Sequence, residues 1–166
     1  MADNKIKNLT LKEKATTLVG ASSMRTYGVP EKGVEGLFLS DGPNGLRCED
    51  PETNAANSIV GASPATCFPT GITMASTWNA DLLQEVGVAM GKECVGFEVN
   101  VLLGPAVNIQ RNPLCGRNFE YYSEDPVLAG TLGTSVVKGV HSPRSCSAWA
   151  CSNSAWARAP SRKSAA

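Results

Sequence analysis

The pattern of apolar and polar residues divides much of the chain into helical and extended stretches. In two long segments, apolar residues recur at intervals of three and four, which predicts amphipathic helices. The first segment carries Leu82, Leu83, Val86, Met90, Cys94 and Phe97, and the second carries Leu128, Leu132, Val136 and Val140. Asn79 is expected to cap the first of these helices, and Asp125 followed by Pro126 is expected to open the second.

Shorter patterns predict a further helix and two strands. Thr10 and Glu13 have the spacing of a capping box, so a helix is expected to start there and to end near Gly20. The apolar runs at residues 37–39 and 99–103 are too short for helices and are typical of buried parallel strands. Helices therefore alternate with strands along the chain.

The order of these elements favours an α/β fold. Alternating helices and strands are typical of a parallel sheet covered by helices. A long polar loop at residues 49–66 follows the first strand, and a second long loop follows the next strand. Loops at the carboxyl ends of strands carry the active site of a (β/α)8 barrel. The pattern alone does not separate such a barrel from an open doubly wound sheet.

Composition excludes several classes of function. Hydrophobic residues make up 42% and charged residues 18% of the 166 residues, which is typical of a soluble globular protein. The net charge is zero, so neither a nucleic acid nor an anionic membrane is expected as a partner. The first residues lack the apolar core of a signal peptide, and no apolar run reaches the roughly 18 residues of a membrane span. A cytoplasmic location is therefore expected.

Cysteine and histidine usage narrows the chemistry further. The six cysteines match no metal-binding CxxC pattern, and without a secretion signal they are expected to be free thiols. His141 is the only histidine, which rules out a histidine-based metal site and argues against a Ser–His relay. No GxGxxG or Walker motif is present, so no metal and no cofactor is expected.

The last segment, residues 142–166, breaks the pattern of the preceding chain. Residues 1–141 hold 11 Lys and Arg against 15 Asp and Glu, whereas residues 142–166 hold 4 basic residues and no acidic residue. Serine and alanine dominate there, and no hydrophobic period continues. A disordered basic tail is one interpretation, although Trp149 and Trp156 are unusual in such a tail. A change of reading frame near codon 141 is the favoured hypothesis.

Four motifs resemble those of a known family. They lie in order at residues 39–47 (LSDGPNGLR), 65–79 (ATCFPT and then ASTWN), 101–109 (VLLGPAVNI) and 111–126 (RNPLCGRNFEYYSEDP). With this order and these separations, the chain resembles the N-terminal segment of a family 3 glycoside hydrolase of the β-glucosidase type. The resemblance implies an α/β fold, the incomplete N-terminal part of a (β/α)8 barrel, over residues 1–141. Residues 142–166 are then an unrelated tail.

The residues that the resemblance marks are suited to sugar binding, because carboxylates accept and guanidinium groups donate hydrogen bonds to hydroxyls. Asp41 could cap a turn, but the resemblance implies that its carboxylate accepts hydrogen bonds from two sugar hydroxyls. Arg117 is either a surface residue paired with a nearby glutamate or, as the resemblance implies, a sugar contact. Glu120 is expected to orient Arg117 or to bind a hydroxyl. Arg47 is a further candidate that could instead pair with the acidic residues after it.

Other residues near these motifs are expected to have structural roles. Tyr121 and Tyr122 could stack on a sugar face, but packing is expected for at least one of them. Trp78 is expected in the core. Glu124 and Asp125 are typical of a helix start, where the helix dipole favours negative charge.

The resemblance implies a retaining mechanism, in which two carboxylates stand about 5–5.5 Å apart. The family's nucleophile lies in a Ser-Asp-Trp segment, but the only Ser-Asp pair here is Ser40-Asp41, which matches a different motif. No catalytic residue is therefore expected in this chain, and the expected ligand is a β-glucoside or an oligosaccharide. The alternatives are a non-catalytic carbohydrate-binding fragment and the product of a damaged gene. The oligomeric state stays open.

Overall fold

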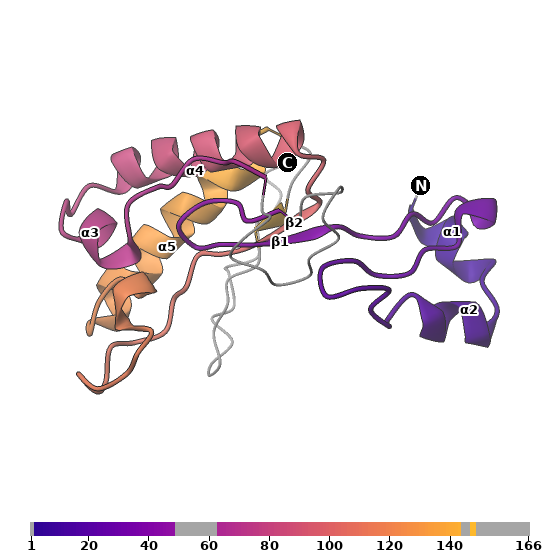
Figure 1. The fold of residues 1–166 in the computed structure, drawn as a ribbon, viewed down its shortest axis with the longest axis horizontal. Coiled ribbons are helices and arrows are strands. Elements are labelled where there is room, and N and C mark those ends of the chain that lie inside the picture. The colour runs from indigo at the N-terminus through magenta and orange to yellow at the C-terminus, as the bar shows by residue number, and fades with distance from the viewer. Residues whose placement is uncertain (1, 49–62, 144–146, 149–166) are drawn as a thin grey trace, which may run out of the picture.

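The computed structural model describes residues 2–48, 63–143 and 147–148. The helices are α1 (Ala2–Lys7), α2 (Leu11–Thr16), α3 (Gly71–Ala75), α4 (Ala80–Gly96) and α5 (Pro126–His141), with 3₁₀ turns η1 (Pro30–Lys32) and η2 (Asn118–Glu120). The strands are β1 (Leu39–Asp41), β2 (Val101–Leu103) and β3 (Ser147–Ala148). Figure 1 shows α1 and α2 at one end of the molecule and α3, α4 and α5 toward the other. None of the helices in the described ranges is long and apolar enough to cross a membrane.

The N-terminal segment confirms the predicted capping box. The Thr10 amide donates to Glu13 Oε2 at 2.6 Å, and the Glu13 amide donates to Thr10 Oγ1 at 3.3 Å. Lys32 Nζ lies 2.7 Å from the same carboxylate oxygen. The hydrogen bond from Lys32, followed by that from the Thr10 amide, lowers the pKa of Glu13 from its ordinary value of 4.5 to about 2. These contacts join α2 to the turn η1.

Helix α2 ends at Thr16, although the sequence predicts an end near Gly20. The Leu18 amide donates to the Ala15 carbonyl, which is the i+3 bond of a tighter turn. Gly20 then pairs with Thr26 in an antiparallel bridge. The Leu18 side chain is 87% exposed, so this end of the helix gains no packing that would extend it. The predicted helix end was wrong by about one turn.

The strands form a parallel sheet in the order β1-β2-β3, as the alternation of elements predicts. Ser40 in β1 lies opposite Leu102 in β2. Strand β1 begins two residues later than the predicted run at 37–39. The reason is that the Leu37 amide donates to Thr26 Oγ1, and the Leu37 carbonyl accepts from the Thr26 amide. Leu37 is therefore bonded to the N-terminal segment and not to the sheet.

Strand β3 lies inside the segment that the sequence separates as a tail. Ser147 and Ala148 pair with the edge of β2 that faces away from β1. Residues 144–146 and 149–166 lie outside the described residues. The domain boundary at residue 141, the disorder of the tail and the change of reading frame therefore stay predictions.

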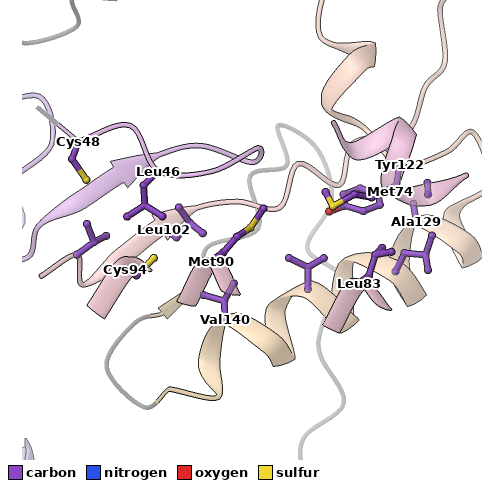
Figure 2. Packing of buried hydrophobic residues seen from close by; sticks show 14 of the residues in the cluster. Leu46, Cys48, Met74, Leu83, Met90, Cys94, Leu102, Tyr122, Ala129 and Val140 are labelled. Atoms are coloured by element: carbon purple, nitrogen blue, oxygen red, sulfur yellow. The ribbon is translucent and has the colours of Figure 1, made fainter. Parts of the chain in front are cut away.

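The hydrophobic core lies between the sheet and the two long helices (Figure 2). Leu102 at the centre of β2 is buried against the predicted faces of α4 and α5, which contribute Leu83, Met90, Cys94, Leu132, Val136 and Val140. The helices approach each other closely, since a Cβ on Gly139 would lie 2.2 Å from the Gln84 carbonyl oxygen. Leu82, which was predicted on the same face, is 41% exposed, so that part of the prediction was wrong.

The side chains of β1 and β2 alternate between two surroundings. The central residues, Ser40 and Leu102, are buried on the side of the helices, whereas the flanking residues are half-buried and point to the opposite face. In a (β/α)8 barrel, that opposite face lines the interior. The fold is the incomplete N-terminal part of such an α/β barrel, and Asp41 lies on the interior face at the carboxyl end of β1.

Three further expectations concern individual residues. Trp78 was predicted in the core, but it lies between α3 and α4 with a φ of +54° and is 75% exposed. Among the described residues, Cys48, Cys67, Cys94 and Cys115 are free thiols, as predicted. Asn79 caps α4 by accepting from the amides of its first turn, as predicted. Most of the predicted loop at 49–66 lies outside the described residues.

Candidate functional site

A pocket of about 500 Å³ opens at the carboxyl ends of β1 and β2. It brings together the four residues that the sequence marks as sugar contacts, Asp41, Arg47, Arg117 and Glu120. The turn after β1, the segment 65–67 before α3 and the turn η2 form its walls. Side chains that are up to 79 positions apart in the sequence thus meet at one end of the sheet, as expected for a barrel site.

The turn after β1 holds Asp41 in a defined position. Gly42 has a φ of +145°, and a Cβ there would lie 1.6 Å from the Gly45 carbonyl oxygen, so only glycine fits. The chain folds back so that the Arg47 amide donates to the Asp41 carbonyl at 2.9 Å. Within the described residues, no hydrogen bond or ion pair engages the Asp41 carboxylate. The carboxylate therefore does not cap this turn.

A buried hydroxyl ties the turn back to the strand. Ser40 is fully buried, and its Oγ donates to the Asp41 carbonyl at 3.0 Å and accepts from the Arg47 amide at 3.1 Å. The Cys48 thiol donates to the same Oγ at 3.6 Å. Burial raises the pKa of Cys48, so the sulfur stays a neutral thiol at pH 7. This arrangement fixes the backbone on both sides of Asp41.

Arg117 and Glu120 form an ion pair on the opposite wall of the pocket. Arg117 Nε donates to Glu120 Oε1, and the two side chains are 50% and 7% exposed. Residue Glu120 is the last residue of η2, and its carbonyl lies so close to α3 that a Cβ on Gly71 would be 2.2 Å away. The ion pair is the contact that the first of the two expected roles, orientation of Arg117, requires, and both expected roles stay predictions. Arg117 and Glu120 both line the pocket.

Polar side chains hold the long loop that carries Arg117. Gln110 Nε2 donates to the Asn118 carbonyl at 2.9 Å and to the Tyr121 carbonyl at 3.3 Å. Asn118 Nδ2 donates to the Asn112 carbonyl at 2.8 Å. Tyr121 and Tyr122 are both buried, so the expected packing role is confirmed for both. The loop around η2 is therefore cross-linked by side chains.

The remaining candidates also have clear positions. The Arg47 side chain is exposed and lines the pocket. The acidic residues that follow it at 49 and 50 lie outside the described residues. Asp125 Oδ1 accepts from the Val127 amide at 2.9 Å, which confirms its predicted role as the cap of α5.

Sequence reasoning missed one prominent residue of the pocket. Phe119 lies between Arg117 and Glu120, lines the pocket and is 51% exposed. Its position between two charged candidates was the available signal in the sequence, because its exposure is known only from the structure. Cys67, another lining residue, is exposed as a free thiol.

The arrangement is suited to holding a neutral polyhydroxyl ligand. Asp41 offers two acceptor oxygens, and Arg47 and Arg117 offer donors. The second carboxylate, Glu120, is already bonded to Arg117. In the part of the chain that the structure describes, no group of three or more His, Cys, Asp or Glu side chains could hold a metal ion.

Comparisons with known proteins identify the family of the chain. The family model for the glycosyl hydrolase family 3 N terminal domain matches residues 52–149. The exo-alpha-(1->6)-L-arabinopyranosidase of Bifidobacterium breve is 46% identical over 137 residues, covering 82% of this chain and 18% of that protein. The thermostable beta-glucosidase B of Acetivibrio thermocellus is 45% identical with the same coverage. The chain thus spans 18% of the length of these relatives.

Solved structures give the same result for the fold. The beta-glucosidase 3B of Thermotoga neapolitana, solved with alpha-D-glucose, matches with a TM-score of 0.75 and 44% identity over 84% of this chain and 21% of that chain. The beta-glucosidase of Kluyveromyces marxianus, solved with glucose, matches with a TM-score of 0.79 and 35% identity over 90% of this chain and 17% of that chain. The fold defines the chain as a segment of a barrel glycoside hydrolase. It belongs to glycosyl hydrolase family 3.

Proposed function

We propose that this chain supplies part of the site in which a retaining family 3 β-glucosidase binds a terminal, non-reducing β-D-glucosyl unit. The observation that carries the proposal is the convergence of Asp41, Arg47 and Arg117 on one pocket at the barrel end. The Asp41 carboxylate is half-buried and has no partner among the described residues, so both of its oxygens can accept sugar hydroxyls. Glu120 forms an ion pair with Arg117, and both residues line the pocket.

The experiment that tests this proposal is a titration of the 166-residue chain with methyl β-D-glucoside, followed by NMR or calorimetry. Asp41→Ala is expected to weaken binding by about one to two orders of magnitude, since a charged hydrogen bond contributes roughly 1.5–3 kcal/mol. Glu85→Ala removes an exposed carboxylate of α4 outside the pocket and serves as the matched control. Equal affinity of the Asp41→Ala variant and the control would refute the proposal.

The names of two relatives support a second candidate for the bound sugar. One relative is named an exo-alpha-(1->6)-L-arabinopyranosidase and another a beta-glucosidase, and their identities to this chain, 46% and 45%, differ by one percentage point. An α-L-arabinopyranosyl unit lacks the hydroxymethyl group of a glucosyl unit but keeps a pyranose ring of hydroxyls. A parallel titration with methyl α-L-arabinopyranoside decides between the two, because the preferred sugar binds more tightly to the same Asp41-dependent site.

The chain is proposed to bind and not to cleave. Retaining hydrolysis needs a nucleophile and an acid/base residue that flank one glycosidic bond. The resemblance places the nucleophile in a Ser-Asp-Trp segment, and the sequence contains no such segment. Residues that only bind hold ground state and transition state alike, which adds little to the rate. No turnover of an aryl β-glucoside is expected. Binding without turnover separates the carbohydrate-binding interpretation from that of an inactive product of a damaged gene, which would bind no sugar.

A further inference from the structure

Glu93 is a carboxylate of α4 that does not itself line the pocket but is bonded to one of its walls. Thr66 Oγ1 donates to Glu93 Oε1, and this bond joins α4 to the segment 65–67 of the pocket. The other oxygen, Glu93 Oε2, is buried and has no hydrogen-bond partner among the described residues. A buried, unpaired carboxylate oxygen costs free energy, because it loses water without gaining a donor. Folding stability alone therefore gives no reason for a carboxylate at this position.

The segment 65–67 has no regular secondary structure to hold it. Residues 63–70 form neither helix nor strand. On one side, the Phe68 amide donates to the Asn44 carbonyl at 2.8 Å. The Thr66 carbonyl oxygen lies so close to the same turn that a Cβ on Gly45 would be 2.2 Å from it. The position of this wall therefore depends on the contacts that its residues make with other elements.

Glu93 supplies the contact of this wall with a packed helix. The residue after it, Cys94, is fully buried in the core, so this part of α4 is held by the sheet and by α5. Thr66 is exposed, and its hydroxyl could bond to water instead. A hydrogen bond to a charged acceptor is stronger than one between neutral groups, which favours the bond to Glu93. The wall is thus held between α4 and the turn after β1.

The same carboxylate also acts on the chain that follows this turn. Burial is the largest cause of the raised pKa of Cys48, the hydrogen bond to Ser40 opposes it, and the negative charge of Glu93 adds to the rise. The Cys48 thiol donates to Ser40 Oγ, one residue before Asp41. Glu93 therefore lies near both the wall that carries Thr66 and the turn that positions Asp41.

We propose that Glu93 is a positioning residue, which fixes the wall 65–67 against the turn that carries Asp41 by accepting a hydrogen bond from Thr66. This inference rests on the proposed function, since it takes the pocket as the sugar site. A wall that is already fixed loses little freedom when a ligand arrives, so the pocket binds more tightly. The unpaired oxygen is the cost in stability that accompanies this role.

Two measurements on the 166-residue chain test the inference, amide exchange at Phe68 and affinity for methyl β-D-glucoside. Glu93→Met removes the carboxylate and keeps most of the side-chain volume. We expect faster exchange at the Phe68 amide, unchanged exchange at Tyr121 and about 3- to 10-fold weaker affinity. Glu93→Gln keeps an acceptor for Thr66 and is expected to retain most of the affinity. Glu85→Met is the matched control, because Glu85 is an exposed carboxylate of the same helix outside the pocket.

A separate variant breaks the same hydrogen bond from the other side. Thr66→Val keeps the shape of an exposed side chain, so the fold does not depend on it. It is expected to reproduce the changes seen with Glu93→Met. The double variant is expected to add no further loss of affinity, because both substitutions remove one bond. Additive losses overturn the inference, since the two residues then act independently.

The outcomes separate the inference from the function on which it rests. The free energy of unfolding of Glu93→Met is expected to be no lower than that of the wild type, because the unpaired oxygen leaves together with the bond. A loss of stability that accounts for the loss of affinity overturns the inference, since a packing role predicts that result.

The two measurements also fail in different ways. Unchanged affinity in Glu93→Met overturns the inference, while binding that depends on Asp41 still supports the proposed function. Affinity that falls equally in Glu93→Met and in the Glu85→Met control overturns the inference as well. Failure of the wild-type chain to bind the glucoside overturns the proposed function. Faster exchange at Phe68 in both Glu93→Met and Thr66→Val would then still support Glu93 as the anchor of this wall.

Discussion

Asp41 and Arg117 lie in the same pocket, but the two connections that carry them are held by different forces. The turn after β1 is short, and its path depends on the backbone of Gly42, the Asp41 carbonyl and one buried hydroxyl. The loop after β2 is long, and side-chain hydrogen bonds and an ion pair hold it. Substitutions should therefore destabilise the first connection through steric conflict and the second through the loss of polar contacts. Substitutions in the two connections test this difference.

The largest effect is expected from Gly42→Ala in the first connection. An added Cβ would lie 1.6 Å from the Gly45 carbonyl oxygen at a φ of +145°, so the turn cannot keep its path. We expect a loss of roughly 3 kcal/mol or more in the free energy of unfolding. Urea denaturation measures it.

Gly116→Ala provides the control in the second connection. No atom lies within 4 Å of a Cβ placed on Gly116, and its φ is not in the left-handed region. The free energy of unfolding from urea denaturation should stay within about 0.5 kcal/mol of the wild type. Equal destabilisation by both alanines would contradict the steric account of the first connection.

The next effect concerns the ion pair of the second connection. Glu120→Gln keeps the shape of the buried side chain but removes its charge, so the guanidinium of Arg117 loses its ion pair with Glu120. Affinity for methyl β-D-glucoside should fall by about 10-fold, which is about 1.4 kcal/mol. Glu85→Gln on α4 is the control with unchanged affinity. An unchanged affinity in Glu120→Gln would show that Arg117 needs no orientation.

An effect of similar size, on stability and not on affinity, is expected when the second connection loses the side-chain amide of Gln110. Gln110→Ala removes both hydrogen bonds that its side chain donates to the turn η2. The free energy of unfolding should fall by about 1–2 kcal/mol. Faster amide exchange at Tyr121, with unchanged exchange at Arg47, would show that the effect stays in the second connection. Equal acceleration at both amides would mean that the two connections are coupled.

The smallest effect is expected from Ser40→Ala in the first connection. The variant removes the hydroxyl that accepts from the Arg47 amide, but this amide keeps the Asp41 carbonyl as its acceptor. We expect a loss of about 1 kcal/mol on thermal or chemical unfolding. Ser40→Cys, with a side chain of similar shape, gives a comparison that keeps the site filled. A loss as large as that of Gly42→Ala would mean that the hydroxyl, and not the backbone, holds the turn.

Much of this protein follows from the sequence alone. The helical period of apolar residues places α4 and α5, and local side-chain hydrogen bonds at Thr10, Asn79 and Asp125 place helix starts. The short apolar runs indicate two parallel strands, and Asp41 lies at the carboxyl end of the first strand. These features are local, because each depends on residues within one or two turns of one another.

Other features were decided only by tertiary contacts. Helix α2 stops at Thr16 because no packing extends it, and β1 starts late because Leu37 bonds to the N-terminal segment. Trp78 is exposed in the turn between α3 and α4, although its hydrophobicity favours the core. The pairing of Glu120 with Arg117 and the place of Phe119 in the pocket depend on the path of a long loop. The path of such a loop depends on contacts with residues distant in the sequence. Local pattern therefore identifies candidate residues, and tertiary structure determines which of them come into contact.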